Sequence, residues 1–130
     1  MRILLDTQCW LWMAASPEKL SPHARALVRT TEHELYLSAA SAWEIAIKHA
    51  LGKLRLPQPP ERYVPARSET LRTLPLPIDE SHALRVAVLP SHHRDPFDRL
   101  LVAQAQIEDL PILTADPVFG RYDVEVIAAG

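Results

Sequence analysis

Short apolar runs bounded by polar or turn residues recur along the chain. Runs of this length that are rich in Leu, Ile and Val predict buried strands. The first run, RILLD, ends in an acid at Asp6, and the second is ELYLS. The predicted strands are residues 2–6, 34–38, 74–78, 112–114 and 124–127.

Between these runs, apolar residues recur at the spacing of a helix. Ser21 and Pro22 give the start signal of one helix, Gly52 gives the stop signal of another, and Asp95 precedes a third. The predicted helices are residues 7–15, a helix from 22, residues 40–51, a helix from Asp79 or Ser81 to about 88, and residues 96–107.

The segment Leu54–Pro77 differs from the rest because it holds six of the 12 prolines. A proline inside a helix costs about 3 kcal/mol relative to alanine. We therefore predict a loop here, with only a short helical piece around residues 68–72 before the next strand.

Strands that alternate with helices are typical of βαβ units and a parallel sheet. The sequence shows no repeat, no low-complexity tract and no linker. We therefore predict a single α/β domain over residues 1–130. Its architecture would be a three-layer sandwich, with a short, mainly parallel sheet and helices on both faces.

Composition excludes several classes of protein. With 3 glycines in 130 residues, neither a GxGxxG motif nor a Walker P-loop is present. The net charge of -2 is unlike that of a protein that coats DNA non-specifically. A single cysteine, Cys9, excludes an intramolecular disulfide and suits a reducing compartment. No apolar stretch is long enough for a signal peptide or a membrane span, so we expect a cytoplasmic protein.

The placement of the acids is the most informative feature. Asp6 ends the first predicted strand, Asp116 follows residues 112–114, and Glu44 and Asp98 lie near the starts of two helices. Because the carboxyl ends of parallel strands share one edge, these four acids are expected to meet there. Clustered carboxylates repel one another unless a cation neutralises them, and oxygen ligands suit Mg²⁺ or Mn²⁺. Such a site favours hydrolysis of a phosphodiester by a metal-activated water.

Each acid also has a purely structural explanation. Asp6 and Asp116 stand where helix N-caps are expected, and Asp116 precedes a proline. The spacings Ser41 to Glu44 and Asp95 to Asp98 resemble capping boxes. Both explanations stay open on the residues alone.

Four segments together resemble the PIN-domain ribonucleases, and more narrowly the VapC-type toxins of bacterial type II toxin–antitoxin systems. They are LLDT at 4–7, SAASAWEIAIK at 38–48, HHRDPFDRLLVAQA at 92–105 and LTADPVF at 113–119. The resemblance covers nearly the whole chain, and HRDPFDR is its most specific part. It implies a Mg²⁺- or Mn²⁺-dependent endoribonuclease that is neutralised by a VapB-like antitoxin and forms a homodimer.

Carried over position by position, the resemblance assigns the metal ligands and catalytic acids. They are Asp6, Glu44, Asp98 and Asp116. Asp95 is an additional acid of this subgroup, and Thr7 and Thr114 resemble the hydroxyl residues that support the metal ligands. Relatives often have His where this chain has Gln8, so a role for that histidine does not transfer.

Some neighbouring polar residues have two interpretations. Arg94 and Arg99 flank the acid pair and could contact RNA phosphate or form ion pairs with the acids. Lys48 follows Glu44 by one helical turn, which favours a local ion pair. His92 and His93 are expected to be solvated loop residues rather than ligands of a hard cation.

The tryptophans are the apolar residues of most interest. Of Trp10, Trp12 and Trp43, at least two are expected in the core, and any exposed one could form a groove for a partner. Cys9 is expected to be a buried packing residue.

Three other functions are weighed against the ribonuclease. A receiver-like signalling domain needs a lysine near a late strand, and the last lysine here is Lys53. A DNA flap nuclease needs an arch and DNA-binding helices that nothing in this chain resembles. A PIN-fold module that binds RNA or a protein without cutting remains the alternative, although the four acids are all present.

Overall fold

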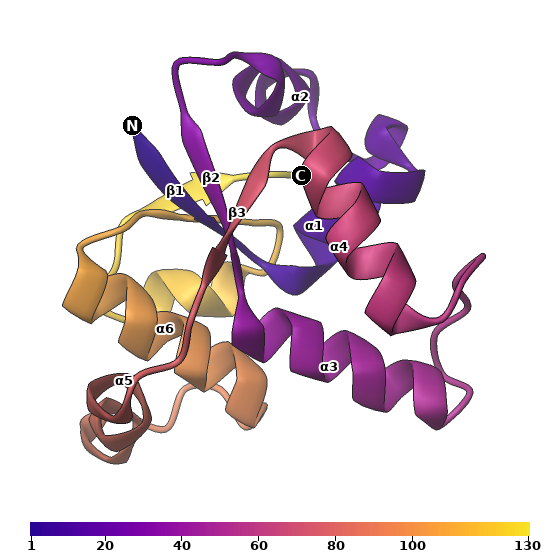
Figure 1. The fold of residues 1–130 in the computed structure, drawn as a ribbon. Coiled ribbons are helices and arrows are strands. Elements are labelled where there is room, and N and C mark those ends of the chain that lie inside the picture. The colour runs from indigo at the N-terminus through magenta and orange to yellow at the C-terminus, as the bar shows by residue number, and fades with distance from the viewer.

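The computed structural model describes residues 1–130 and contains one five-stranded sheet in which every pair of neighbouring strands is parallel (Figure 1). Its order is β3-β2-β1-β4-β5. The strands are β1 (Arg2–Leu5), β2 (Glu34–Ser38), β3 (Thr73–Leu76), β4 (Ile112–Thr114) and β5 (Val126–Ala128). The central strand β1 lies between β2 and β4, with Leu5 level with Leu113. The prediction of a mainly parallel sheet is confirmed.

Six α-helices surround the sheet. They are α1 (Thr7–Ala15), α2 (Pro22–Arg29), α3 (Ala39–Ala50), α4 (Pro60–Leu71), α5 (Glu80–Arg85) and α6 (Pro96–Glu108). Short 3₁₀ turns occupy Pro17–Lys19, Val86–Val88 and Pro117–Arg121. None of the helices has the length and apolar character needed to cross a bilayer.

The sheet separates two apolar cores, as expected for a three-layer sandwich. Successive side chains of β1 point to opposite faces, so Ile3 and Leu5 join one core while Leu4 joins the other. Helices α1, α2 and α4 cover the first face, and α6 with α5 beside it covers the second (Figure 1). Trp10 is the largest fully buried side chain and fills the first core.

The prediction for the proline-rich segment is wrong. The structure has a twelve-residue helix, α4, instead of a short helical piece around residues 68–72. Pro60 occupies the first turn, where no amide is needed, and only Pro65 removes a hydrogen bond within the helix. Packing offsets that loss, because Tyr63 is buried with its ring edge-on to Trp10 at 6.2 Å.

Smaller differences concern the ends of elements. Helix α3 begins after Ser38, whose hydroxyl accepts a hydrogen bond from the amide of Ala40, so the capping box predicted at Ser41 is wrong. β3 begins one residue earlier than predicted, and β5 begins two residues later. Asp79, rather than Ser81, is the N-cap of α5.

Candidate metal centre

Asp6 lies at the middle of the sheet edge, directly after β1. Its amide donates to the carbonyl of Leu113 at 3.0 Å, which holds it level with the end of β4. The residue is 8% exposed, and its carboxylate accepts a 2.8 Å hydrogen bond from the Thr114 hydroxyl. Asp6 occupies the N-cap position of α1, as the sequence suggested, but its side chain makes no capping hydrogen bond. Capping therefore does not account for its carboxylate.

Glu44 lies on the buried side of α3 and is 4% exposed. Its Oε2 accepts a hydrogen bond from Lys48, one turn further along the helix, as the spacing predicted. Its Oε1 is buried and has no hydrogen-bond partner. A buried carboxylate oxygen without a donor is costly unless something else binds it.

The start of α6 carries two acids with different tasks. Asp95 is the N-cap, and its Oδ1 accepts from the amides of Phe97 and Asp98. Asp98 lies in the first turn with a side chain that is 14% exposed. The structural explanation therefore holds for Asp95, whereas Asp98 caps nothing and faces the other acids.

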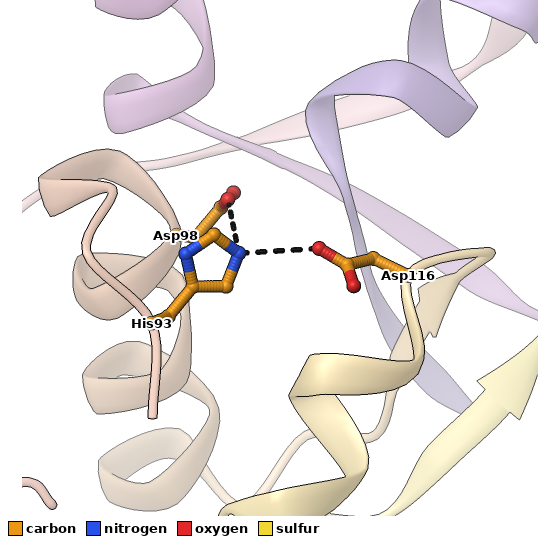
Figure 2. A group of neighbouring side chains, drawn as sticks. All are labelled: His93, Asp98 and Asp116. Atoms are coloured by element: carbon orange, nitrogen blue, oxygen red, sulfur yellow. Dashed lines mark hydrogen bonds and ion pairs between the residues drawn. The ribbon is translucent and has the colours of Figure 1, made fainter. Parts of the chain in front are cut away.

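Asp116 follows β4 and has two roles at once. Its Oδ1 accepts from the amide of Val118 and caps the 3₁₀ turn, as a helix cap would. Its Oδ2 lies 3.1 Å from Nε2 of His93, and the same nitrogen lies 2.9 Å from Oδ2 of Asp98. Figure 2 shows the imidazole between the two carboxylates, which come from different elements.

A single cavity of about 460 Å³ is lined by all the predicted acids. They are Asp6, Glu44, Asp95, Asp98 and Asp116. The side chains of Lys48 and Lys53 line the same cavity and are its only cations. The predicted convergence at the carboxyl ends of the strands is thus observed.

Burial and the closeness of the other acids raise the pKa of two carboxyl groups in this cavity. Burial, followed by repulsion from the neighbouring carboxylates of Asp95, Asp6 and Glu44, raises the pKa of Asp98 to about 8. Burial also raises the pKa of Asp6, although the hydrogen bond from Thr114 opposes that shift. In both acids burial is the main cause, and repulsion from the other carboxylates of the cavity adds to it.

The donor set fits a hard divalent cation. Carboxylate oxygens are the ligands that Mg²⁺ and Mn²⁺ prefer, and Glu44 offers a buried oxygen that no protein group binds. The residues that would hold the ion are Asp6, Glu44, Asp98 and Asp116. A bound cation would also remove the repulsion that raises the pKa of Asp98.

Hydroxyl groups link the elements that carry these acids. The Thr114 hydroxyl donates to Asp6 and accepts from the amide of Asp116 at 3.0 Å. The Thr7 hydroxyl donates to the Ser41 hydroxyl at 2.7 Å, which joins the first turn of α1 to α3. The hydrogen bonds of Thr7 and Thr114 place both beside the acid cluster.

The family is decided by comparison with known proteins. A family model described as PIN domain matches residues 3–125. The chain belongs to the PIN domain family. A curated relative, Ribonuclease VapC16 of Mycobacterium tuberculosis, is 50% identical to it over 58 residues. That stretch is 45% of this chain and 41% of the relative, so the chain matches well under half of that protein's length.

Solved structures show the same fold at low sequence identity. One is VapBC2 from Rickettsia felis bound to a DNA fragment from their promoter, with a TM-score of 0.73, 12% identity and full coverage of both chains. Another is VapBC-1 from nontypeable Haemophilus influenzae, with a TM-score of 0.66, 20% identity and 98% coverage of both chains. The PIN-like fold predicted from the sequence is confirmed.

Arg99 is not placed as the sequence predicted. In this PIN domain its guanidinium donates to the backbone carbonyls of Pro90, Val86 and Leu89, and forms no ion pair with the acids. It ties the segment after α5 to α6, so the predicted ion pair of Arg99 with the acids is wrong, whereas its contact with RNA stays a prediction. Arg94 is exposed on the loop before α6, and its contact with RNA stays a prediction.

His93 is the residue whose place in this PIN domain the sequence reasoning missed. It is only 18% exposed in its side chain and contacts two of the acids, whereas His92 is exposed with its ring against Tyr122. The expectation of a solvated histidine is wrong for His93 because the Tyr122 hydroxyl accepts from its amide at 2.7 Å and fixes the loop. Its position inside the HRDPFDR segment was the available signal.

Trp10 and Cys9 are buried as predicted, Trp12 is only partly buried, and a partner groove at the exposed Trp43 stays a prediction. Trp10 is fully buried, Trp12 packs against the same core, and Trp43 is 56% exposed with its ring edge-on to Phe97 at 5.0 Å. Cys9 is fully buried, and burial raises the pKa of its thiol to about 12.

Proposed function

We propose that this protein is a Mg²⁺- or Mn²⁺-dependent endoribonuclease, and that it acts as a VapC-type toxin. One observation carries the proposal: Glu44, whose Oε1 is buried and has no hydrogen-bond partner, lines a cavity together with four further carboxylates. A purely structural acid cluster would leave that oxygen hydrogen-bonded or exposed. The short match to Ribonuclease VapC16 supports RNA as the substrate class.

In this proposal the cation, when bound, activates a water and neutralises charge on the phosphodiester. The chain supplies the geometry. Asp6 is fixed by Thr114, Glu44 is held on the buried side of α3, and Asp98 and Asp116 face each other across His93. Lys48 neutralises one oxygen of Glu44 and leaves the other for the ion.

The partner follows from the same comparison. The two solved structures described above are VapBC structures, so we propose a VapB-like antitoxin as the partner of this chain. We also propose a homodimer in the cytoplasm, as the resemblance implies. Size-exclusion chromatography with light scattering would distinguish a dimer from a monomer, and co-expression with the neighbouring reading frame would test the antitoxin.

Cleavage of total bacterial RNA tests the activity. The purified, antitoxin-free protein should give discrete fragments with Mg²⁺ or Mn²⁺, and none with EDTA. Asp98→Asn should abolish cleavage because it removes a ligand charge while keeping the shape of the side chain. Asp109→Asn is the matched control, because it removes one charge from an exposed residue at the far end of α6. Intact RNA with folded, metal-loaded wild-type protein would favour the alternative of a PIN-fold binding module.

A further inference from the structure

The imidazole of His93 is fixed in one orientation by three separate contacts. Its own amide donates to the Tyr122 hydroxyl, and its ring packs against Phe119 with centroids 5.8 Å apart. Its Nδ1 accepts a 3.2 Å hydrogen bond from the amide of Asp95. The ring therefore presents its other nitrogen, Nε2, to the acid cluster (Figure 2).

The hydrogen bond from Asp95 also decides which nitrogen carries the proton. A nitrogen that accepts from an N–H group has a free lone pair and no hydrogen. Nδ1 of His93 is therefore unprotonated, and the neutral ring must carry its hydrogen on Nε2. That hydrogen is donated to Oδ2 of Asp116, 3.1 Å from Nε2, and Oδ2 of Asp98 lies 2.9 Å from the same nitrogen.

This tautomer excludes direct coordination of a metal ion by His93, which the distances would otherwise allow. His93, Asp98 and Asp116 bring three ligand atoms within 4.8 Å of one another, which is close enough to hold a metal ion. A nitrogen with a hydrogen attached has no lone pair for a metal. While the amide of Asp95 occupies Nδ1, Nε2 can donate but cannot ligate. Each carboxylate still has further lone pairs for a cation after it accepts one hydrogen bond.

We propose that His93 is a positioning residue that donates from Nε2 to Asp116, holds that carboxylate beside Asp98 for the divalent cation, and does not ligate the cation. This inference rests on the proposed function, since it presumes that the acids bind an ion. Groups that donate to ligating carboxylates typically change metal affinity about 10–100-fold when they are removed.

Mn²⁺ titration calorimetry on the full chain tests the donor role. His93→Ala should weaken Mn²⁺ binding about 10–100-fold. His93→Gln keeps an N–H donor of similar reach and should restore most of the affinity. His92→Ala, on the same loop but away from the acids, should bind Mn²⁺ like the wild type. If His93→Ala binds Mn²⁺ as tightly as the wild type does, the inference about His93 is overturned and the proposed function is not.

Two measurements on the wild-type protein remain informative if a variant fails to fold. Nitrogen-15 NMR of the metal-free protein should show the hydrogen of the His93 ring on Nε2, and a hydrogen on Nδ1 would contradict the proposal. Electron spin echo modulation of the Mn²⁺-loaded protein should show no directly bound imidazole nitrogen, and such a signal that disappears in His93→Gln would overturn it. Wild-type protein that binds no Mn²⁺ at all would instead contradict the proposed function, and the inference with it.

Discussion

The Thr114 hydroxyl donates a 2.8 Å hydrogen bond to Oδ2 of Asp6, joining two residues that are 108 positions apart in the chain. The contact joins the carboxyl ends of β4 and β1, which are neighbouring strands followed by Asp116 and Asp6. The same hydroxyl accepts from the amide of Asp116, so one side chain orients two candidate ligands. Thr114 is itself 2% exposed, which leaves the hydroxyl no competing water.

Replacement of Thr114 by valine should therefore weaken the metal site without changing its ligands. Valine has the same shape but cannot donate to Asp6 or accept from Asp116. We expect the Mn²⁺ dissociation constant to rise about 10–100-fold, measured by calorimetry. Thr114→Ser is the matched control, because it keeps the hydroxyl. Equal affinity in the valine variant would show that the hydrogen bond does not orient Asp6.

Asp98→Asn should make the metal-free protein more stable at pH 8 while abolishing cleavage. In the folded chain the pKa of Asp98 is raised to about 8, against about 3.9 in an unfolded chain. Between these values the folded state binds a proton that the unfolded state lacks, so stability falls as pH rises from about 4 to 8. Asparagine carries no charge and removes this loss.

Thermal unfolding in EDTA measures that effect. The melting temperature of the wild type should fall between pH 6 and pH 8, and that of the Asp98→Asn protein should fall less. Relief of about 1 kcal/mol corresponds to roughly 2–8 °C for domains of this size range. Mn²⁺ should raise the melting temperature of the wild type at pH 8, because it binds only the folded state. A variant less stable than the wild type at pH 8 would contradict the electrostatic explanation.

Arg99→Ala should act on stability rather than on RNA binding. The guanidinium holds three backbone carbonyls together, and loss of hydrogen bonds to a charged group of this kind costs about 1–3 kcal/mol. Urea unfolding measures the loss. Arg94→Ala provides the contrast: it should leave the free energy of unfolding unchanged and weaken RNA binding. A filter-binding assay in the non-cleaving Asp98→Asn background would show whether the two arginines differ in this way.

Cys9 should be unreactive until the protein unfolds. The side chain is fully buried, and burial raises the pKa of its thiol to about 12, so almost no thiolate forms at pH 8. Titration with a chromogenic disulfide reagent should detect no thiol in the native protein and one thiol in guanidinium chloride. Rapid labelling of the native protein would mean that α1 opens readily from the sheet.

The regular elements were largely predictable because their signals are local. Pro22 at the start of α2 and the cap at Asp95 act within one helical turn. The convergence of Asp6 and Asp116 was also predictable, since parallel strands share one edge for their carboxyl ends. Helix α4 was not, because its stability depends on the burial of Tyr63 against Trp10, a contact between distant segments.

Side-chain roles near the acids were the least predictable. Arg99 lies beside Asp98 in the sequence, yet its guanidinium donates to the backbone carbonyls of Pro90 and Val86 and not to the acids. His93 shares its loop with His92, and only the bonds to Tyr122 and Asp95 bring its ring to the site. Neither outcome follows from sequence spacing, because the partners of both side chains are set by how the loop before α6 folds onto the protein.

The sequence by itself therefore determined the α/β class, the sheet edge where the acids gather and the oxygen-rich character of the site, since these depend on periodicity and on the order of strands. Only the tertiary structure decided which acids cap helices, which oxygen of Glu44 stays without a partner and which nitrogen of His93 faces the acids. These are questions of direction and hydrogen-bond geometry. They are settled when segments far apart in the chain pack together and exclude water.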